Sequence, residues 1–262
     1  MNIATRMRLN RANPAEVVLA RLKRLASLSV EDEALVLGLS AHRHTHAAGA
    51  EIFGEGHLMR RPQVLLSGWA CRQRALSDGR RQIFAFLLPG DALGLCARPE
   101  PLALANTISL TRSETADARS LADALEAGSP RHAGLDAAFA MAAALEEAWL
   151  LDHLMRVGRQ TAYERTAHLL LEFHWRLSMV GLTEGWRYHM PLTQEVLSDA
   201  LGLSVVHMNR TLQQLRREGR VAIQSGEVEL LQPDLLAQVA DFNPPRPSDG
   251  GRPPPPLGLM GA

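Results

Sequence analysis

Six side chains between residues 205 and 213 carry groups that can recognise the edges of DNA bases. Arg210 has a planar guanidinium that matches O6 and N7 of guanine, whereas Val205 and Val206 offer only apolar contact, for instance to the methyl group of thymine. This chemistry is recognition by hydrogen bonding and shape, not bond making. The six side chains are Val205, Val206, His207, Asn209, Arg210 and Gln213.

Two short helices joined by a tight turn are predicted to position these groups. Thr193 is a good N-cap for the first helix, because its hydroxyl can accept a bond from an amide of the first turn. Gly202 supplies the positive φ at which such a helix ends, and Ser204 caps the second helix. The apolar positions fall at helical spacing, at Leu197 and Leu201 in the first helix and at Met208, Leu212 and Leu215 in the second.

This pattern predicts a helix-turn-helix, with the second helix presenting the six side chains to a major groove. An ordinary hairpin of two helices inside a helical core remains an alternative for this stretch taken alone. Residues 156–220 hold nine arginines against six acidic residues, although the formal charge of the whole chain is zero. The charge is therefore tilted in the direction that DNA binding favours.

Length and composition indicate a globular protein with room for two domains. The chain has 262 residues, of which 46% are hydrophobic, and no apolar run approaches the ~18 residues that a membrane helix needs. We read no export signal at the N-terminus and expect a cytoplasmic protein without a membrane partner. Cys71 and Cys96 give neither a disulfide framework nor the ligands of an iron–sulfur cluster, and we expect no cofactor.

Short apolar runs separated by glycine extend from His42 to Ala118 and predict a small antiparallel barrel or jelly roll. Asp78-Gly79 between two alternating runs indicates a hairpin. Residues 14–39 have the spacing of two short helices, with Ser29 as an N-cap.

A long helix is predicted from Leu135 to Arg156, followed by another from Thr161 to Val180. An apolar stripe on the long helix is either core or a dimer seam, and we favour the seam because DNA readers of this kind work in pairs. Ser225-Gly226 indicates a hairpin that would form a wing beside the second helix of the helix-turn-helix. The stripe comprises Leu135, Phe139, Ala142, Leu145 or Glu146, Trp149 and His153.

The order of barrel, long helix and winged helix resembles the Crp/Fnr family of bacterial transcription regulators over about residues 15 to 240. The segments that carry the resemblance are GWACRQRALSDGRRQIFAFLLPGD, TAYERTAHLLLE and LTQEVLSDALGLSVVHMNRTLQQLRREG. The resemblance implies a homodimer that reads a near-palindromic site on double-stranded DNA and performs no catalysis; RNA polymerase as a further partner is left open. It implies DNA contacts by Thr193, Gln194, Ser204, Val205, Val206, His207, Asn209, Arg210 and Gln213.

Two departures from the family pattern concern mechanism. Cyclic-nucleotide-binding members carry Gly-Glu followed by Arg-Ser or Arg-Thr, whereas here Asp91 follows Gly90 and no such arginine pair comes after it. We therefore expect no cyclic nucleotide, and the small-molecule effector, if there is one, is unknown. Many members place Arg-Glu after the capping serine, where this chain has Val205 and Val206, so we expect a different half-site.

A rival site is a metal centre of the cupin type in the barrel. His42, His44 and His46 alternate on a predicted strand, and Gly38 and Glu51 complete a spacing close to the first cupin motif. No histidine lies between His57 and His132 to supply the second motif, so we expect no metal site, and a metal-binding enzyme domain fused to a winged helix stays the alternative.

The predicted fold is α+β, with an N-terminal antiparallel jelly roll, a long dimerisation helix and a C-terminal winged helix-turn-helix. We expect a disordered N-terminus at residues 1–13 and a disordered tail rich in Pro and Gly at 241–262. The predicted domains are a sensory β-domain at 14–130, the dimerisation helix at 131–158 and the DNA-binding domain at 159–240.

Overall fold

The computed structural model describes residues 13–95, 101–126, 128 and 130–244. The chain divides into two compact units, and the boundary falls within one long helix, after Ala144. Described residues 13–144 and 179–181 form the first unit, and residues 145–178 and 182–244 form the second. Most of the two predicted disordered ends, and Cys96, lie outside the described residues.

The described part of the first unit begins with two helices, α2 (Glu16–Leu25) and α3 (Val30–Gly38), followed by a 3-10 turn at Leu39–Ala41. Ser29 caps α3 as predicted: its hydroxyl accepts from the backbone of Asp32, and the Asp32 carboxylate accepts from the backbone of Ser29. This reciprocal pair holds the start of α3 in place.

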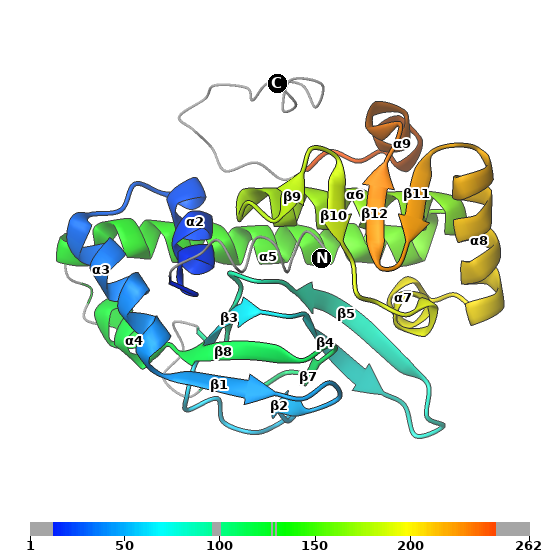
Figure 1. The fold of residues 1–262 in the computed structure, drawn as a ribbon. Helices are drawn as coiled ribbons and strands as arrows, with labels where there is room; N and C mark the ends of the chain where they lie inside the picture. The colour runs from blue at the N-terminus through cyan, green and yellow to red at the C-terminus, as the bar shows by residue number, and fades with distance from the viewer. Residues whose placement is uncertain (1–12, 96–100, 127, 129, 245–262) are drawn as a thin grey trace. The chain divides into compact units, whose positions relative to one another are not determined.

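Two four-stranded antiparallel sheets follow and confirm the predicted β region (Figure 1). The first has the order β1-β8-β3-β6, and the second has the order β2-β7-β4-β5. Leu65 and Leu93 from one sheet pack with Ala70 and Leu87 from the other, so side chains fill the space between the sheets. The strands are β1 (Arg43–His46), β2 (Glu51–Phe53), β3 (Gln63–Ser67), β4 (Ala70–Ala75), β5 (Arg81–Leu87), β6 (Ala92–Leu93), β7 (Asn106–Ser109) and β8 (Ser113–Asp117).

The helical connection between the units is longer than predicted. After α4 (Arg119–Glu126) and a 3-10 turn at Pro130–His132, α5 runs from Ala133 to Arg159. Its 27 residues span about 40 Å at 1.5 Å per residue. Helix α6 follows at Ala162–Met179.

The stripe on α5 that we interpreted as either core or a dimer seam is largely buried within the same chain, which supports core, the interpretation that we did not favour. Leu135, Leu145, Trp149 and His153 are all buried, and the Trp149 ring packs edge-on against Trp175 of α6 at 5.3 Å. A different face of α5 is apolar and exposed: its four large side chains are between 52% and 65% accessible in the single chain. These are Leu150, Leu151, Leu154 and Met155.

The second unit packs α6 against a small sheet of order β11-β12-β10-β9. Phe173 of α6 and Tyr188 of β10 are fully buried, and the Tyr188 hydroxyl donates to the carbonyl of Leu170 at 2.8 Å. The elements after α6 are β9 (Thr183–Glu184), β10 (Arg187–His189), α7 (Gln194–Leu201), α8 (Val205–Arg217), β11 (Val221–Gln224), β12 (Glu227–Leu230) and α9 (Pro233–Ala240).

Within the described residues, no helix combines the length and the hydropathy that crossing a bilayer requires.

Candidate DNA-binding surface

The turn between α7 and α8 is built by local hydrogen bonds. The Thr193 hydroxyl accepts from the amide of Val196 at 3.2 Å, and the Ser204 hydroxyl accepts from the amide of His207 at 3.2 Å. Gly202 ends α7 with φ of +63°, a conformation that a side chain would strain. Both predicted caps and the predicted turn are therefore present.

The facing sides of α7 and α8 are apolar or small and are buried. Ser198 and Ala200 of α7 are nearly inaccessible, which allows a second helix to approach closely. The Thr211 hydroxyl of α8 is satisfied within its own helix, because it donates to the carbonyl of His207 at 3.0 Å. The buried residues of α8 are Met208, Thr211, Leu212 and Leu215.

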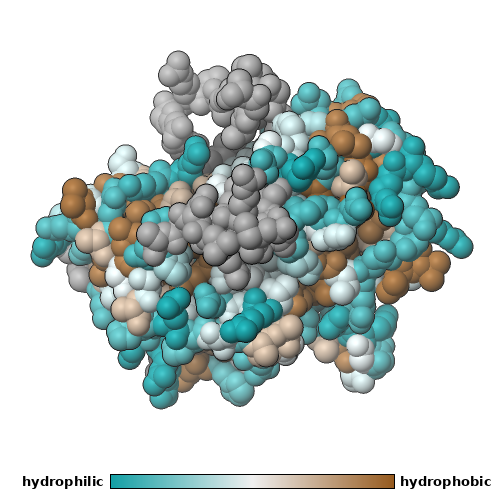
Figure 2. All heavy atoms as spheres, viewed as in Figure 1, coloured by the Kyte–Doolittle hydropathy of each residue, from teal (hydrophilic) through white to brown (hydrophobic). Residues whose placement is uncertain are grey.

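This packing leaves one face of α8 exposed, and the candidate residues lie on it. Val205 and Val206 are 45% and 62% accessible, and the surface over α8 is largely hydrophilic, with a hydrophobic area at the end nearest α7 (Figure 2). Asn209 is only half-buried and is not free: its amide donates to the Gln194 side chain at 2.9 Å. The exposed candidates are Thr193, Gln194, Ser204, Val205, Val206, His207, Arg210 and Gln213.

Helix α6 fixes both helices of the pair, a role that sequence reasoning missed. Arg165 donates to the carbonyl of Leu201 at 2.8 Å, at the end of α7 where the carbonyls lack helical partners. The Tyr163 hydroxyl donates to the Glu218 carboxylate at 2.6 Å, just after α8. Both side chains come from TAYER, the start of the α6 segment that carried the family resemblance, which is the signal that could have found them.

A hairpin stands beside α8, as predicted. Ser225 and Gly226 have φ of +52° and +80°, the conformation of a tight turn between antiparallel strands. The Gly226 carbonyl accepts from the amide of Met190 at 2.7 Å, so the turn is anchored to the chain that leads into α7. Hairpin and helix pair together have the arrangement of a winged helix-turn-helix.

The positive charge counted in this part of the chain is not all at the surface. Arg156 of α5 and Arg176 of α6 are buried around the carboxylate of Glu172, which pairs with both. Burial opposes ionisation of Glu172, but the two guanidinium groups hold its pKa below the usual range. This cluster joins α5 to α6 and contributes nothing to a surface that would meet phosphates.

Two histidines lie against the same cluster and are neutral. Burial lowers the pKa of His153 and of His168 to about 4, and the nearby charge of Arg156 adds to the effect. His168 also meets Phe242 edge-on at 4.9 Å, and the third inward histidine, His174, is stacked on Trp186. The contacts of His168 and His174 are therefore those of packed side chains.

The rival metal set does not come together. His44 and His46 lie on β1, whereas Glu51 lies on β2 in the other sheet. His46 Nε2 is hydrogen-bonded to the hydroxyl of Thr115 at 2.9 Å. In the part of the chain that the structure describes, no three His, Cys, Asp or Glu side chains form a group that could hold a metal ion.

Asp91, which stands where cyclic-nucleotide-binding members have a glutamate, is also committed elsewhere. Its carboxylate forms a buried ion pair with Arg21 of α2 at 2.8 Å and accepts from the amide of Leu88 at 2.7 Å. A buried pair of this kind ties the loop after β5 to α2.

Known proteins resemble this chain in the same region and beyond it. The model of the Crp-like helix-turn-helix domain matches residues 164–239. The nitrogen fixation regulation protein FixK of Azorhizobium caulinodans is 31% identical over 185 residues, which cover 71% of this chain and 73% of that protein. FixK of Rhizobium meliloti is 26% identical over 198 residues, covering 75% of this chain and 86% of that protein.

A solved structure agrees over a similar span. FixK2 from Bradyrhizobium japonicum matches with a TM-score of 0.64 and 27% identity, covering 75% of this chain and 96% of that one. The predicted α+β fold with a winged helix-turn-helix is thereby confirmed, and the relatives are regulators rather than enzymes. The chain belongs to the Crp/Fnr family and is a DNA-binding transcription regulator similar to FixK.

Proposed function

We propose that this regulator binds a near-palindromic DNA site as a homodimer, with one α8 in the major groove of each half-site. The observation that carries the proposal is the exposed face of α8. The side chains of Arg210 and His207 are exposed on it, next to Val205 and Val206. A recognition helix reads bases from its first turns, which is where these residues lie. The DNA contacts proposed are those of Thr193, Gln194, Ser204, Val205, Val206, His207, Asn209, Arg210 and Gln213.

The hydrogen bond between Asn209 and Gln194 supports a division of labour on this surface. Because the Asn209 amide already donates to Gln194, direct reading of bases falls mainly to Arg210 and His207. Val205 and Val206 would supply apolar contacts, and the two capping hydroxyls would lie near phosphates.

The exposed apolar face of α5 supports the dimer. Four large aliphatic side chains exposed on one helix are costly in water, and a second copy of the same helix would cover them. We therefore place the proposed dimer contact on Leu150, Leu151, Leu154 and Met155 and not on the stripe that includes Trp149 and His153.

We further propose that cyclic AMP is not the effector, because Asp91 is committed to Arg21. Thermal unfolding without cyclic AMP and with cyclic AMP at about 1 mM tests this. The midpoint temperature of unfolding is expected to stay the same. A rise of several degrees, as a ligand at about 100-fold excess over its Kd would produce, would contradict the proposal. Contact with RNA polymerase and a cytoplasmic location stay predictions.

Binding-site selection from a random DNA library tests the proposal as a whole. The expected product is a near-palindrome whose half-sites lie one helical turn apart, with a half-site that differs from that of relatives bearing glutamate after the capping serine. A single, asymmetric site would contradict the dimer, and recovery of those relatives' half-site unchanged would contradict the role given to Val205 and Val206.

A further inference from the structure

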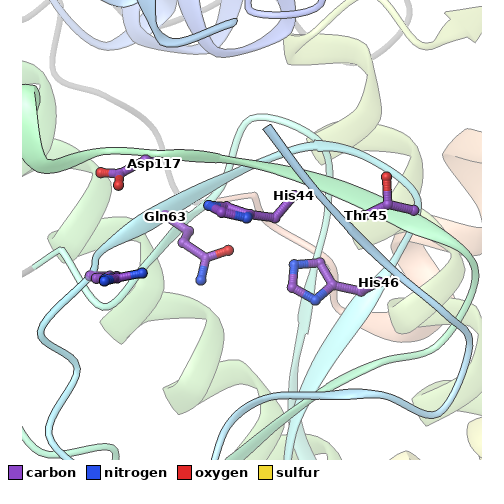
Figure 3. Close-up of a pocket in the computed structure, with 6 residues that line it drawn as sticks. His44, Thr45, His46, Gln63 and Asp117 are labelled. Atoms are coloured by element: carbon purple, nitrogen blue, oxygen red, sulfur yellow. The ribbon is translucent and has the colours of Figure 1, made fainter. Parts of the chain in front are cut away.

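A polar pocket of about 340 Å³ lies on the sheet β1-β8-β3-β6, in the unit that does not carry the helix-turn-helix. His44 and His46 of β1, Gln63 of β3 and Asp117 of β8 gather around it, and Arg61 completes the lining together with Thr45 (Figure 3). Its volume is in the range of sites that hold a small metabolite, roughly 300–1,000 Å³. Nothing in the helix-turn-helix mechanism uses this pocket.

A chain of hydrogen bonds determines which groups the pocket offers. The Thr115 hydroxyl donates to Oε1 of Gln63, so it can only accept from Nε2 of His46, which lies at 2.9 Å. With its oxygen occupied, Gln63 has its amide NH₂ left as a donor. Burial lowers the pKa of His46 and outweighs a hydrogen bond with the Gln63 side chain, which raises it; nearby His44 lowers it further.

The one carboxylate of the lining, that of Asp117, is already paired with the guanidinium of Arg119. Nε of Arg119 donates to Oδ1 and Oδ2 of Asp117 at 3.1 and 2.9 Å, and the Arg119 backbone amide donates as well. Burial opposes ionisation of Asp117, but these bonds outweigh it and hold the pKa of its carboxyl below the usual range. Arg61, in contrast, is exposed and pairs with no carboxylate among the described residues.

The lining therefore carries an uncompensated positive charge together with further hydrogen-bond donors. Arg61 supplies the charge, and the Gln63 amide and the His44 ring supply further hydrogen bonds. Hydrogen bonds from a guanidinium to a carboxylate or phosphate are about twice as strong as those between neutral groups, and the planar fork can make two at once. A compact anion is the ligand that would satisfy all three.

We propose that this pocket binds a small organic anion bearing a carboxylate or a phosphate, held by Arg61 with Gln63 and His44 donating. Binding needs only the first unit. A regulatory role for the anion rests on the proposed function, in which the second unit binds DNA.

Isothermal titration calorimetry of the full chain tests the proposal. Inorganic phosphate and malonate are titrated separately, at constant ionic strength. Binding of either probe is expected, and the stronger one identifies the anionic group. Arg61→Ala should weaken binding at least tenfold, whereas Arg60→Ala, which removes the same charge from the neighbouring residue, should change it less than twofold. Gln63→Glu, which sets a carboxylate against the anion, should abolish binding.

Two results would overturn the proposal. One is a Kd weaker than about 10 mM for both probes. The other is an equal loss from Arg61→Ala and Arg60→Ala, which would mean diffuse surface attraction. Fluorescence anisotropy with selected DNA separates this from the proposed function: a protein that binds DNA but neither probe contradicts only the pocket, and one that binds a probe but no DNA contradicts only the regulator. Thermal unfolding checks that each variant is folded.

Discussion

Arg210 is the only permanent cation in the first two turns of α8, and its side chain is exposed. The neighbouring polar residue, Asn209, donates a hydrogen bond to Gln194, which links the start of α7 to α8. At the residue scale, the base reading that we propose would therefore depend on few free groups. Val205 and Val206 offer only apolar contact and add no hydrogen-bonding group to this set.

The buried histidines beside Arg156 make stability depend on pH. Because the pKa of His153 and of His168 is about 4 in the folded chain but about 6.5 in the unfolded one, the unfolded state binds protons first as the pH falls. Stability should be fully present above pH 6.5 and should decline from there toward pH 4. Between pH 6.5 and 5 the loss should be roughly 2 kcal/mol for each histidine.

Urea unfolding across this pH window measures the effect. Exchange of both His153 and His168 for Gln should flatten the dependence on pH between 6.5 and 5, whereas His42→Gln, at an exposed position, should leave it in place. An unchanged slope in the double variant would show that these two rings are not the groups responsible.

At the scale of elements, the cap of α8 determines whether its first turn is formed. Ser204→Ala removes the acceptor for the His207 amide and should cost about 1 kcal/mol in stability. Its effect on DNA affinity should be larger than its effect on unfolding suggests, because the frayed turn carries Val205, Val206 and His207. Ser204→Asp, which restores an acceptor, should recover the stability but not the affinity, because it adds a negative charge near phosphates. Affinity unchanged in Ser204→Ala would separate this turn from the DNA contact.

A second prediction at this scale concerns the exposed face of α5. Leu151→Glu together with Leu154→Glu should convert the proposed dimer to a monomer in sedimentation experiments, since charges would be buried without partners. Leu104→Glu is the matched control, because Leu104 is 63% accessible and lies in the β unit, outside α5. A double variant that still sediments as a dimer would place the contact elsewhere.

Capping and turn chemistry are local, which is why the helix-turn-helix could be predicted closely from the sequence. Thr193, Gly202, Ser204 and the turn at Ser225 each act within a few residues of themselves. The seam on α5 could not be predicted in the same way, because the helix has two apolar faces and periodicity does not say which one is covered. The partner that covers Trp149 is Trp175, on another helix.

At the scale of the whole molecule, the number of charged residues in a segment does not predict how much of that charge lies at the surface. The excess of arginines in residues 156–220 pointed to DNA, but Arg156 and Arg176 are buried around Glu172. Asp91 likewise pairs with Arg21, seventy positions earlier in the chain. Such pairings arise from tertiary packing, so no local sequence pattern predicts them. The family resemblance is carried instead by the order of elements and by the helix-turn-helix.

The central claim is that α8 reads bases through Arg210. Fluorescence anisotropy with the selected duplex and each of its single-base variants, at one salt concentration, tests it for Arg210→Ala against Arg24→Ala, an exposed arginine of the other unit. Arg210→Ala should lose about 1–3 kcal/mol on the selected duplex and should no longer discriminate at one base position in each half-site, while Arg24→Ala behaves as the wild type. An equal loss on every duplex, or no loss at all, would contradict the claim.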